Sequence, residues 1–186
     1  MQKDIYNSIK ALENGQTILY PTDTIWGIGC DATDPLAVTN VYALKKRIES
    51  KALICLVSDI EMLESFVELI PNKVRDIIKD AKKPTTIIYS NPKNFAKNLL
   101  AEDGSIGIRL VTSGFAYELI KKFKKPIVST SANYSGEPSP KSFKEISQGI
   151  LKEVDYVVNL QGLQTETKPS SIIKLNDDGT VHVIRH

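Results

Sequence analysis

The apolar positions of the chain follow two different periods. Spacings of three and four residues predict helices, and these fall at 4–14, 34–47, 115–123 and 140–150, with another that begins at Pro71. Short apolar runs rich in β-branched residues predict strands, and these fall at 17–20, 25–30, 53–57, 85–89, 106–110, 127–128, 154–160, 171–175 and 180–184. Helices and strands alternate at first, and the last strands follow one another directly. The sequence therefore predicts an α/β fold with a twisted mixed parallel/antiparallel sheet flanked by helices.

The ends of several predicted elements carry local signals. Gly15 follows the first helix as a C-cap, and residues 34–35 (Asp-Pro) supply an N-cap and a proline at the first helical position. Ser142 and Glu145 have the spacing of a capping box. Residues 177–179 (Asp-Asp-Gly) predict the turn between the last two strands. These signals predict where three helices and the last two strands should begin or end.

The composition narrows the class of protein. A chain of 186 residues predicts one domain over residues 1–186, and a net charge of +2 gives no general nucleic-acid footprint. Cys30 and Cys55 lie in apolar runs, which predicts buried, reduced thiols. No apolar run approaches about 18 residues, and the N-terminus lacks the pattern of a signal peptide. We therefore expect a cytoplasmic protein with no membrane contact.

Two polar loops follow predicted strands that lie far apart in the sequence. Residues 21–27 (Pro-Thr-Asp-Thr-Ile-Trp-Gly) lead through a helix to residues 45–47 (Lys-Lys-Arg), and residues 129–138 are rich in hydroxyl groups. Ligands of α/β sheets bind just beyond the ends of strands. The two loops and the cations therefore predict a site for a polyanion such as a nucleotide, with small donors beside it that orient a second substrate.

Other nucleotide and catalytic motifs do not fit. Residues 27–32 match the pattern G-x-G-x-x-A, but the segment reads as a strand rather than the opening of a helix, and a P-loop is absent. His182 and His186 lie near no cysteine pair or carboxylate cluster, which argues against a protein-held metal. Ser131 lacks a nucleophile elbow and an upstream histidine, which argues against a catalytic triad.

Several features have a second interpretation that the sequence leaves open. Lys45 and Arg47 also suit the charged last turn of a helix, and residues 129–133 also suit a plain turn. Residues 121–125 carry four lysines, which favours a solvated helix end over a contact with RNA. Trp26 favours a place in the core or the pocket wall over a stacking platform.

The motifs together resemble one family. They occur in order as residues 21–27, Lys45-x-Arg47, 105–109 (Ser-Ile-Gly-Ile-Arg), 129–133 (Ser-Thr-Ser-Ala-Asn) with 139–140, 169–173 (Pro-Ser-Ser-Ile-Ile) and Arg185. This combination resembles the YrdC/TsaC family of threonylcarbamoyl-AMP synthases over essentially the whole chain, in the short form without an extra C-terminal domain. The resemblance implies the YrdC-like (YrdC/RibB) fold with a large, concave, basic cavity.

The resemblance also implies a reaction. L-Threonine, bicarbonate and ATP would give L-threonylcarbamoyladenylate and pyrophosphate, with Mg²⁺ carried by ATP and no protein-held metal. Other proteins would then transfer the threonylcarbamoyl group to tRNA, and whether tRNA or double-stranded RNA contacts this chain directly stays open. Neither chemical step needs a protein nucleophile, so positioning and charge neutralisation would carry catalysis.

The family pattern assigns roles to individual residues of this chain. The residues that would hold threonine are Thr24, Arg109, Ser131 and Ser170. Those that would hold ATP are Lys45, Arg47, Lys51, Ser105, Asn133, Lys141 and Arg185. The catalytic group would consist of Lys45, Arg47, Ser131 and Asn133.

The chain departs from the family pattern at several positions. Lys51 stands where the family has an asparagine that meets ATP, and Leu56 replaces a histidine that often contacts threonine. Residues 82–84 (Lys-Lys-Pro) replace a Pro-Gly-Pro segment, and Lys141 replaces a threonine near ATP. The resemblance therefore leaves the contacts at these positions open.

Two other functions compete with the synthase. A carbamoyl-adenylate-forming domain would keep the fold and change the reaction, but proteins of that kind are longer and carry zinc-finger segments, whereas this chain has two cysteines and no C-x-x-C. A non-catalytic double-stranded RNA-binding module would use the basic cavity alone, although a net charge of +2 is weak for it.

Overall fold

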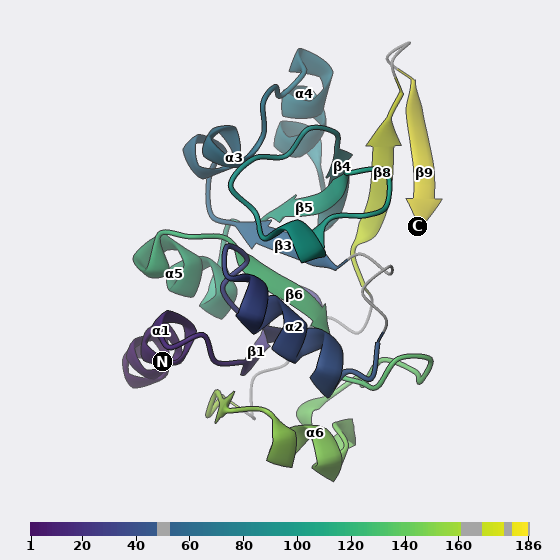
Figure 1. Cartoon of the computed structure of the whole chain (residues 1–186). Helices are drawn as coiled ribbons and strands as arrows, with labels where there is room; N and C mark the ends of the chain where they lie inside the picture. Colours follow the sequence, from purple (N-terminus) through teal and green to yellow (C-terminus); the bar gives the residue numbers. More distant parts are fainter. Residues whose placement is uncertain (48–52, 161–168, 177–179, 186) are drawn as a thin grey trace.

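The computed structural model describes residues 1–47, 53–160, 169–176 and 180–185 (Figure 1). The strands of this part are β1 (Ile18–Pro21), β2 (Trp26–Gly29), β3 (Ile54–Val57), β4 (Thr85–Tyr89), β5 (Ile106–Leu110), β6 (Ile127–Ser131), β7 (Tyr156–Val157), β8 (Ser171–Leu175) and β9 (Val181–Arg185). They form one sheet in the order β7-β1-β2-β6-β3-β5-β4-β8-β9. The pairs β1–β7, β3–β5 and β4–β8 are parallel and the other pairs are antiparallel. The predicted mixed sheet is confirmed.

Helices cover the two faces of the sheet unequally. The helices are α1 (Gln2–Glu13), α2 (Pro35–Leu44), α3 (Ile60–Phe66), α4 (Asn72–Asp80), α5 (Gly114–Phe123) and α6 (Gln148–Glu153), with 3-10 turns η1 (Lys97–Leu99) and η2 (Phe143–Glu145). One face packs against α2, α3, α4 and α6 in a single core that includes Cys55 and Ile108. The other face packs against α1 and α5 through residues such as Tyr20 and Leu56, and α1 and α5 lie side by side (Figure 1).

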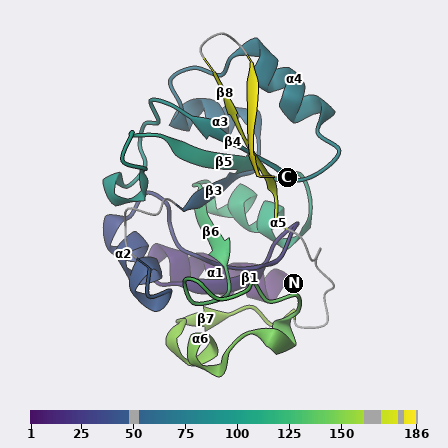
Figure 2. The ribbon, with the colours of Figure 1, turned by 90° about the vertical axis from the view of Figure 1, so that its right-hand side faces the viewer.

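The molecule is elongated along the sheet order. Helix α4 and strands β8 and β9 lie at one end, and α6 with β7 lies at the other, in both views (Figures 1 and 2). Strand β2 approaches its neighbours closely. A Cβ atom at Gly29 would lie 2.3 Å from the carbonyl oxygen of Val128 and 2.8 Å from the ring of Tyr20. Glycine is therefore required at this position.

Most of the predicted strands are confirmed, and β4, β5 and β8 have the predicted bounds. The predicted strand 127–128 continues to Ser131, because β6 pairs with β3 along its first half and with β2 along its second. The predicted strand 154–160 is wrong in length and contains only β7, which lies at the edge of the sheet. Beyond it, the backbone N–H of Val158 still donates to the carbonyl oxygen of Leu19, and the backbone N–H of Asn159 donates to the carboxylate of Asp4.

The helix predicted over 34–47 begins as expected and ends early. The Asp34 carboxylate accepts hydrogen bonds from the backbone N–H groups of Leu36 and Ala37, so the predicted N-cap is confirmed. The helix stops at Leu44, and Lys46 takes a left-handed backbone conformation with φ of +50°. The prediction that residues 45–47 form the last helical turn is therefore wrong.

The helix predicted over 140–150 is wrong. The structure has η2 and α6 there, and the Ser147 hydroxyl caps α6 by accepting from the backbone N–H of Ile150. The predicted capping box does not form, because the Glu145 carboxylate accepts from the backbone N–H of Lys141 instead. Helix α3 was not predicted, although Asp59 caps it through the backbone N–H of Met62.

The remaining expectations concern thiols, a turn and the membrane. Cys30 and Cys55 are buried and free, as predicted. Gly15 follows the C-cap Asn14 with φ of +69°, and the turn predicted at 177–179 lies outside the described residues. In the described part of the chain, no helix has both the length and the apolar character that crossing a bilayer requires.

Candidate active site

A row of registered residues crosses the face of the sheet that carries α1 and α5. Arg109 on β5 pairs in register with Leu56 on β3 and with Thr86 on β4. Thr86 pairs with Ile172 on β8, which pairs with Arg185 on β9. Because registered partners of adjacent strands point to the same face, these five side chains share it.

A cavity of about 220 Å³ lies on this face. Its floor comes from the strands and its rim comes from the loop between β1 and β2 and from residues 169–170. Apolar side chains of Ile54 and Ile172 line it together with polar groups. The predicted site residues that line it are Thr24, Arg47, Arg109, Ser131, Ser170 and Arg185.

The loop between β1 and β2 is held by its own side chains. The Thr22 hydroxyl donates to the carbonyl oxygen of Ile25 at 2.7 Å and accepts from the backbone N–H of Thr24 at 3.0 Å. It also lies 2.9 Å from the Thr24 hydroxyl. A threonine that bonds nearby backbone groups stabilises a turn. Both threonine hydroxyls are therefore fixed at the rim of the cavity.

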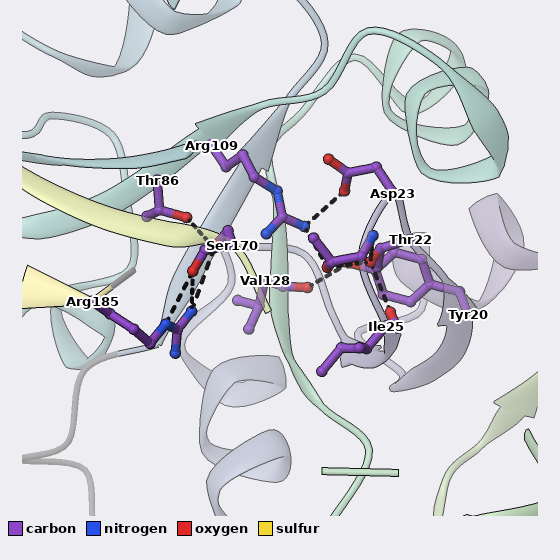
Figure 3. A network of polar contacts seen from close by, with 10 residues as sticks. Tyr20, Thr22, Asp23, Ile25, Thr86, Arg109, Val128, Ser170 and Arg185 are labelled. Carbon is purple, nitrogen blue, oxygen red and sulfur yellow. Dashed lines mark hydrogen bonds and ion pairs between the residues drawn. The ribbon is translucent and has the colours of Figure 1, made fainter. Parts of the chain in front are cut away.

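Arg109 lies against this loop and is 2% exposed. Its Nη2 donates to the carboxylate of Asp23 at 2.8 Å and to the Thr24 hydroxyl at 3.3 Å (Figure 3). Its Nε–H is buried and has no hydrogen-bond partner within the part of the chain that the structure describes. A guanidinium has five N–H donors in a planar fork, so Asp23 fixes this group and leaves further donors for a second anion.

Ser170 and Arg185 form a second polar group on the same face. The Arg185 guanidinium donates from Nε and Nη2 to the carbonyl oxygen of Ser170, at 3.0 and 2.8 Å. The Ser170 hydroxyl lies 2.8 Å from the Thr86 hydroxyl (Figure 3). Burial lowers the pKa of Arg185, and the positive charge of Arg109 lowers it further. Both guanidiniums line the same cavity.

The two cations of the Lys-x-Arg motif have different surroundings. Arg47 lines the cavity and is half-buried, and burial lowers the pKa of its guanidinium. Lys45 does not line the cavity. Its ammonium donates to the carbonyl oxygens of Ser131 and Asn133. Burial, followed by the charge of Arg47, lowers the pKa of Lys45 to about 8.

Asn133 directs its amide donors back into its own loop. Its Nδ2 donates to the carbonyl oxygens of Tyr134 and Glu137, at 3.0 and 2.7 Å. Its buried Oδ1 has no hydrogen-bond partner among the described residues, and Asn133 does not line the cavity. The unused atom of this side chain is an acceptor, which suits a hydroxyl or amino group of a ligand better than a phosphate oxygen.

Ser105 and Lys141, two further predicted site residues, do not line the cavity. The Ser105 hydroxyl donates to the Asp103 carboxylate at 2.6 Å, and this bond is the main reason that the pKa of Asp103 is lowered. The Lys141 side chain is exposed and does not line the cavity. Lys51 lies outside the described residues. Leu56, in the place of the family's histidine, is fully buried in the core beneath α5.

Burial answers one of two questions that the sequence left open. Trp26 is 1% exposed and packs edge-on against Phe143, so it belongs to the core. The four lysines of residues 121–125 are exposed, which suits a solvated helix end and an RNA contact equally, and Lys125 forms an ion pair with Asp31 at 2.7 Å.

Sequence reasoning missed three kinds of site residue. Asp23 belongs to the motif at 21–27 but was given no role, and its pairing with Arg109 depends on the tertiary fold. Thr86 and the apolar wall residues Ile54 and Ile172 lie within strands, where alternation between faces was the available signal. Within the described residues, no group of three or more histidine, cysteine, aspartate or glutamate side chains could hold a metal ion.

A mixed sheet with arginines and hydroxyl groups around a cavity on one face defines an α/β protein that binds anionic small molecules. The sequence matches the family model Sua5_yciO_yrdC, described as "Telomere recombination", over residues 10–186. The chain belongs to this family.

Curated relatives of similar length carry enzyme names. The chain is 33% identical over 174 residues to a threonylcarbamoyl-AMP synthase of Pseudoalteromonas translucida, and the match covers 92% of each chain. It is 35% identical over 174 residues to a putative threonylcarbamoyl-AMP synthase of Methanocaldococcus jannaschii, over 94% of this chain and 81% of the relative. These homologues are named as synthases, which are transferase-type enzymes.

Solved structures share the fold. E. coli YciO superposes with a TM-score of 0.86 at 24% identity, over 100% of this chain and 90% of YciO. P. abyssi Sua5, in a crystal structure complexed with L-threonine, superposes with a TM-score of 0.83 at 23% identity. That match covers 97% of this chain and 53% of Sua5, so the chain spans about half the length of Sua5. The expected YrdC-like fold is confirmed.

Proposed function

We propose that this protein is an L-threonylcarbamoyladenylate synthase. It converts L-threonine, bicarbonate and ATP into L-threonylcarbamoyladenylate, pyrophosphate and water. The observation that carries the proposal is Arg109, a buried guanidinium beside the cavity, fixed by Asp23 and with donors to spare. Such a group can bind the carboxylate of an amino acid in a defined orientation. The names of the curated relatives support the same reaction.

Threonine would bind between the loop of β1 and β2 and the end of β6. In this arrangement, Arg109 pairs with the threonine carboxylate, and the hydroxyls of Thr24, Ser131 and Ser170 orient the rest of the molecule. Thr24 and Ser170 are buried and already held by neighbouring groups. Fixed donors do not need to reorganise when the substrate arrives, which favours catalysis by positioning.

ATP would bind on the side of the cavity that Arg47 and Arg185 line. The amine of threonine captures the carbon of carbon dioxide or bicarbonate and becomes a carbamate. A carbamate oxygen then attacks the α-phosphorus, and the bond between that phosphorus and pyrophosphate breaks. The arginines neutralise charge on the phosphates, and Mg²⁺ enters as part of the ATP complex.

The other residues assigned to the ATP site would contribute in ways that depend on where they lie relative to the cavity. Asn133 offers its Oδ1 to a donor of the nucleoside. Lys45 does not line the cavity wall. It would contribute to catalysis indirectly, through the loop that it contacts. Ser105, Lys141 and Lys51 would contribute only where ATP extends beyond the cavity described above.

The reactivity of the product indicates where the protein would act and which partners it would need. Threonylcarbamoyladenylate is a mixed anhydride that water can hydrolyse, so a transferase that modifies tRNA must accept it promptly. We place this chemistry in the cytoplasm, with downstream threonylcarbamoyl-transferase proteins as partners. Contact of this chain with tRNA itself is not needed for the reaction.

The test is a product assay with the purified protein. ATP, Mg²⁺, bicarbonate and labelled L-threonine should give a threonine-containing adenylate and pyrophosphate, and omission of either threonine or bicarbonate should abolish both products. Arg47→Ala and Ser131→Ala should lower the rate about 10²- to 10³-fold, whereas Lys144→Ala, at an exposed position away from the cavity, should not.

Two other outcomes would reject the proposal. Pyrophosphate release that needs carbamoyl phosphate instead of threonine would identify a carbamoyl-adenylate-forming enzyme. Salt-sensitive binding of double-stranded RNA without any turnover would identify a binding module.

A further inference from the structure

Lys45 is a buried lysine next to the cavity. It is 1% exposed, and its Nζ donates to the carbonyl oxygens of Ser131 and Asn133, the latter at 2.6 Å. A buried ammonium is costly unless its donors are used. The two carbonyls that use them lie at the end of β6 and in the following loop. The ammonium is therefore directed at the backbone of residues 131–133.

The turn at residues 45–46, directly after α2, contacts the loop that follows β6 at two further points. The backbone N–H of Ser135 donates to the carbonyl oxygen of Lys45 at 2.9 Å. The Lys46 ammonium lies 4.4 Å from the centre of the Tyr134 ring, within the range of a cation–π contact. The segment 131–135, which we call the β6 loop, is thus fastened by the turn that ends α2.

The two carbonyl bonds determine where the side chains of the β6 loop point. Each peptide unit is planar, so a fixed carbonyl direction fixes the plane that joins one residue to the next. The planes after Ser131 and after Asn133 are both fixed by the one ammonium. The Ser131 hydroxyl lines the cavity on a strand end that also pairs with Gly27 of β2, and the fixed planes set the backbone from which the Asn133 side chain extends.

We propose that Lys45 is a positioning residue that holds the β6 loop in its binding conformation, and that Arg47 is the cation of the Lys-x-Arg motif that contacts phosphate. The identity of the substrates in this inference rests on the proposed function. The compact ammonium of lysine reaches two carbonyls at once, whereas the flat fork of arginine suits phosphate. The sequence motif therefore combines two separate tasks at positions two residues apart.

Hydrogen exchange in the absence of substrates tests the positioning role directly. Lys45→Met keeps the length and apolar stem of the side chain and removes its donors. Amide exchange of residues 131–137 should rise on the order of tenfold or more in this variant, and stay unchanged in Arg47→Met and in the exposed control Lys144→Met. Unchanged exchange of the β6 loop in Lys45→Met would overturn the proposal.

Substrate affinities separate positioning from phosphate binding. Since the β6 loop carries Ser131 and Asn133, Lys45→Met should weaken threonine and ATP by similar factors, about tenfold each. Arg47→Met should weaken ATP alone and make its affinity less dependent on salt. If Lys45→Met weakened only ATP and reduced the salt dependence as Arg47→Met does, Lys45 would be a phosphate ligand and the proposal would be wrong.

A third test uses the wild-type protein, so its outcome does not depend on whether a variant folds. Acetylation by a lysine-selective reagent should leave Lys45 unmodified in the free protein, while the exposed Lys144 reacts in the same sample. Rapid acetylation of Lys45 that ATP prevents would show an accessible phosphate ligand and contradict the proposal. The exchange and acetylation experiments use no turnover, so their results stand even if the product assay fails and the proposed function is rejected.

Discussion

The two loops that border the cavity reach their fixed conformations in different ways. The loop between β1 and β2 is stabilised from within, because the Thr22 hydroxyl bonds Thr24 and Ile25. The β6 loop has internal hydrogen bonds from the Asn133 amide, but it is also fastened from outside, by Lys45 and Lys46. A loop of the first kind can be recognised from its own sequence. A loop of the second kind cannot, because its partners lie about 86 residues away along the chain.

The difference also separates the roles of the cations. Arg109 contacts the internally stabilised loop and keeps donors for a ligand, so it is a binding group. Lys45 directs donors at the other loop and is absent from the cavity wall, so it is a structural group for the site. Two buried cations near one cavity therefore have opposite relations to the substrate.

The largest expected effect concerns Arg109. Arg109→Met should weaken threonine binding about 10²- to 10³-fold, because it removes the guanidinium that pairs with the carboxylate. ATP affinity should change by no more than a few fold. Steady-state kinetics with each substrate varied in turn measures both, and Arg47→Met serves as the matched variant with the opposite pattern. Equal losses for both substrates would show that Arg109 supports the whole site rather than one substrate.

The next effect tests whether the first loop is self-contained. Thr22→Val keeps the shape of the side chain and removes the hydroxyl that joins Thr24 and Ile25. We expect the free energy of unfolding to fall by about 1–3 kcal/mol, and amide exchange to rise in residues 22–25. Urea unfolding and hydrogen exchange measure the two quantities.

The control for this prediction lies in the other loop. Exchange of the β6 loop should stay unchanged in Thr22→Val, since no hydrogen bond of Thr22 reaches it. A parallel rise in both loops would mean that they are coupled and that the comparison between them fails.

Sequence reasoning succeeded where local contacts determine the structure and failed where distant contacts do. Strands β4, β5 and β8 could be predicted residue by residue, because apolar β-branched runs with polar ends leave little choice. The strands follow from local patterns. The cavity lining at Thr24, Arg109, Ser131 and Ser170 was instead assigned by the resemblance of the motifs to a known family.

What could not be predicted depends on distant partners. From the sequence, Lys45 was interpreted as a phosphate ligand or as part of a helix end. Only the fold shows that its ammonium donates to the carbonyl oxygens of Ser131 and Asn133. The single helix expected over 140–150 does not form, for a related reason. Ser142 and Glu145 have the correct spacing, but the Glu145 carboxylate bonds Lys141 and the Ser147 hydroxyl begins a shorter helix.

An effect of similar size should appear in the pH dependence of stability. Burial lowers the pKa of Lys45 from 10.5 to about 8, with a further contribution from Arg47 and an opposing one from Glu137. Between these values the folded protein carries a neutral Lys45 while the unfolded chain is still protonated. Folding then releases a proton, so a rise in pH from 8 to 10.5 stabilises the folded state, by up to about 3 kcal/mol.

The matched variant isolates this contribution. Lys45→Met lacks the titrating group and retains the others, so the difference in unfolding free energy between wild type and variant should shift in favour of the wild type over this range. Urea titrations at several pH values measure it. A difference that stays constant with pH would show that the carbonyls of Ser131 and Asn133 keep the ammonium charged.

The smallest effect concerns the contact of the β6 loop with α6. A Cβ atom at Gly149 would lie 2.2 Å from the Tyr134 hydroxyl oxygen, so Gly149→Ala requires the Tyr134 ring to move. Because the ring also contacts Lys46, its displacement should loosen the loop slightly while both carbonyl bonds of Lys45 remain. We expect a loss of activity of about two- to fivefold, with exchange of the β6 loop raised less than in Lys45→Met. A larger rise than in Lys45→Met would place the main support of the loop at Tyr134 instead of Lys45.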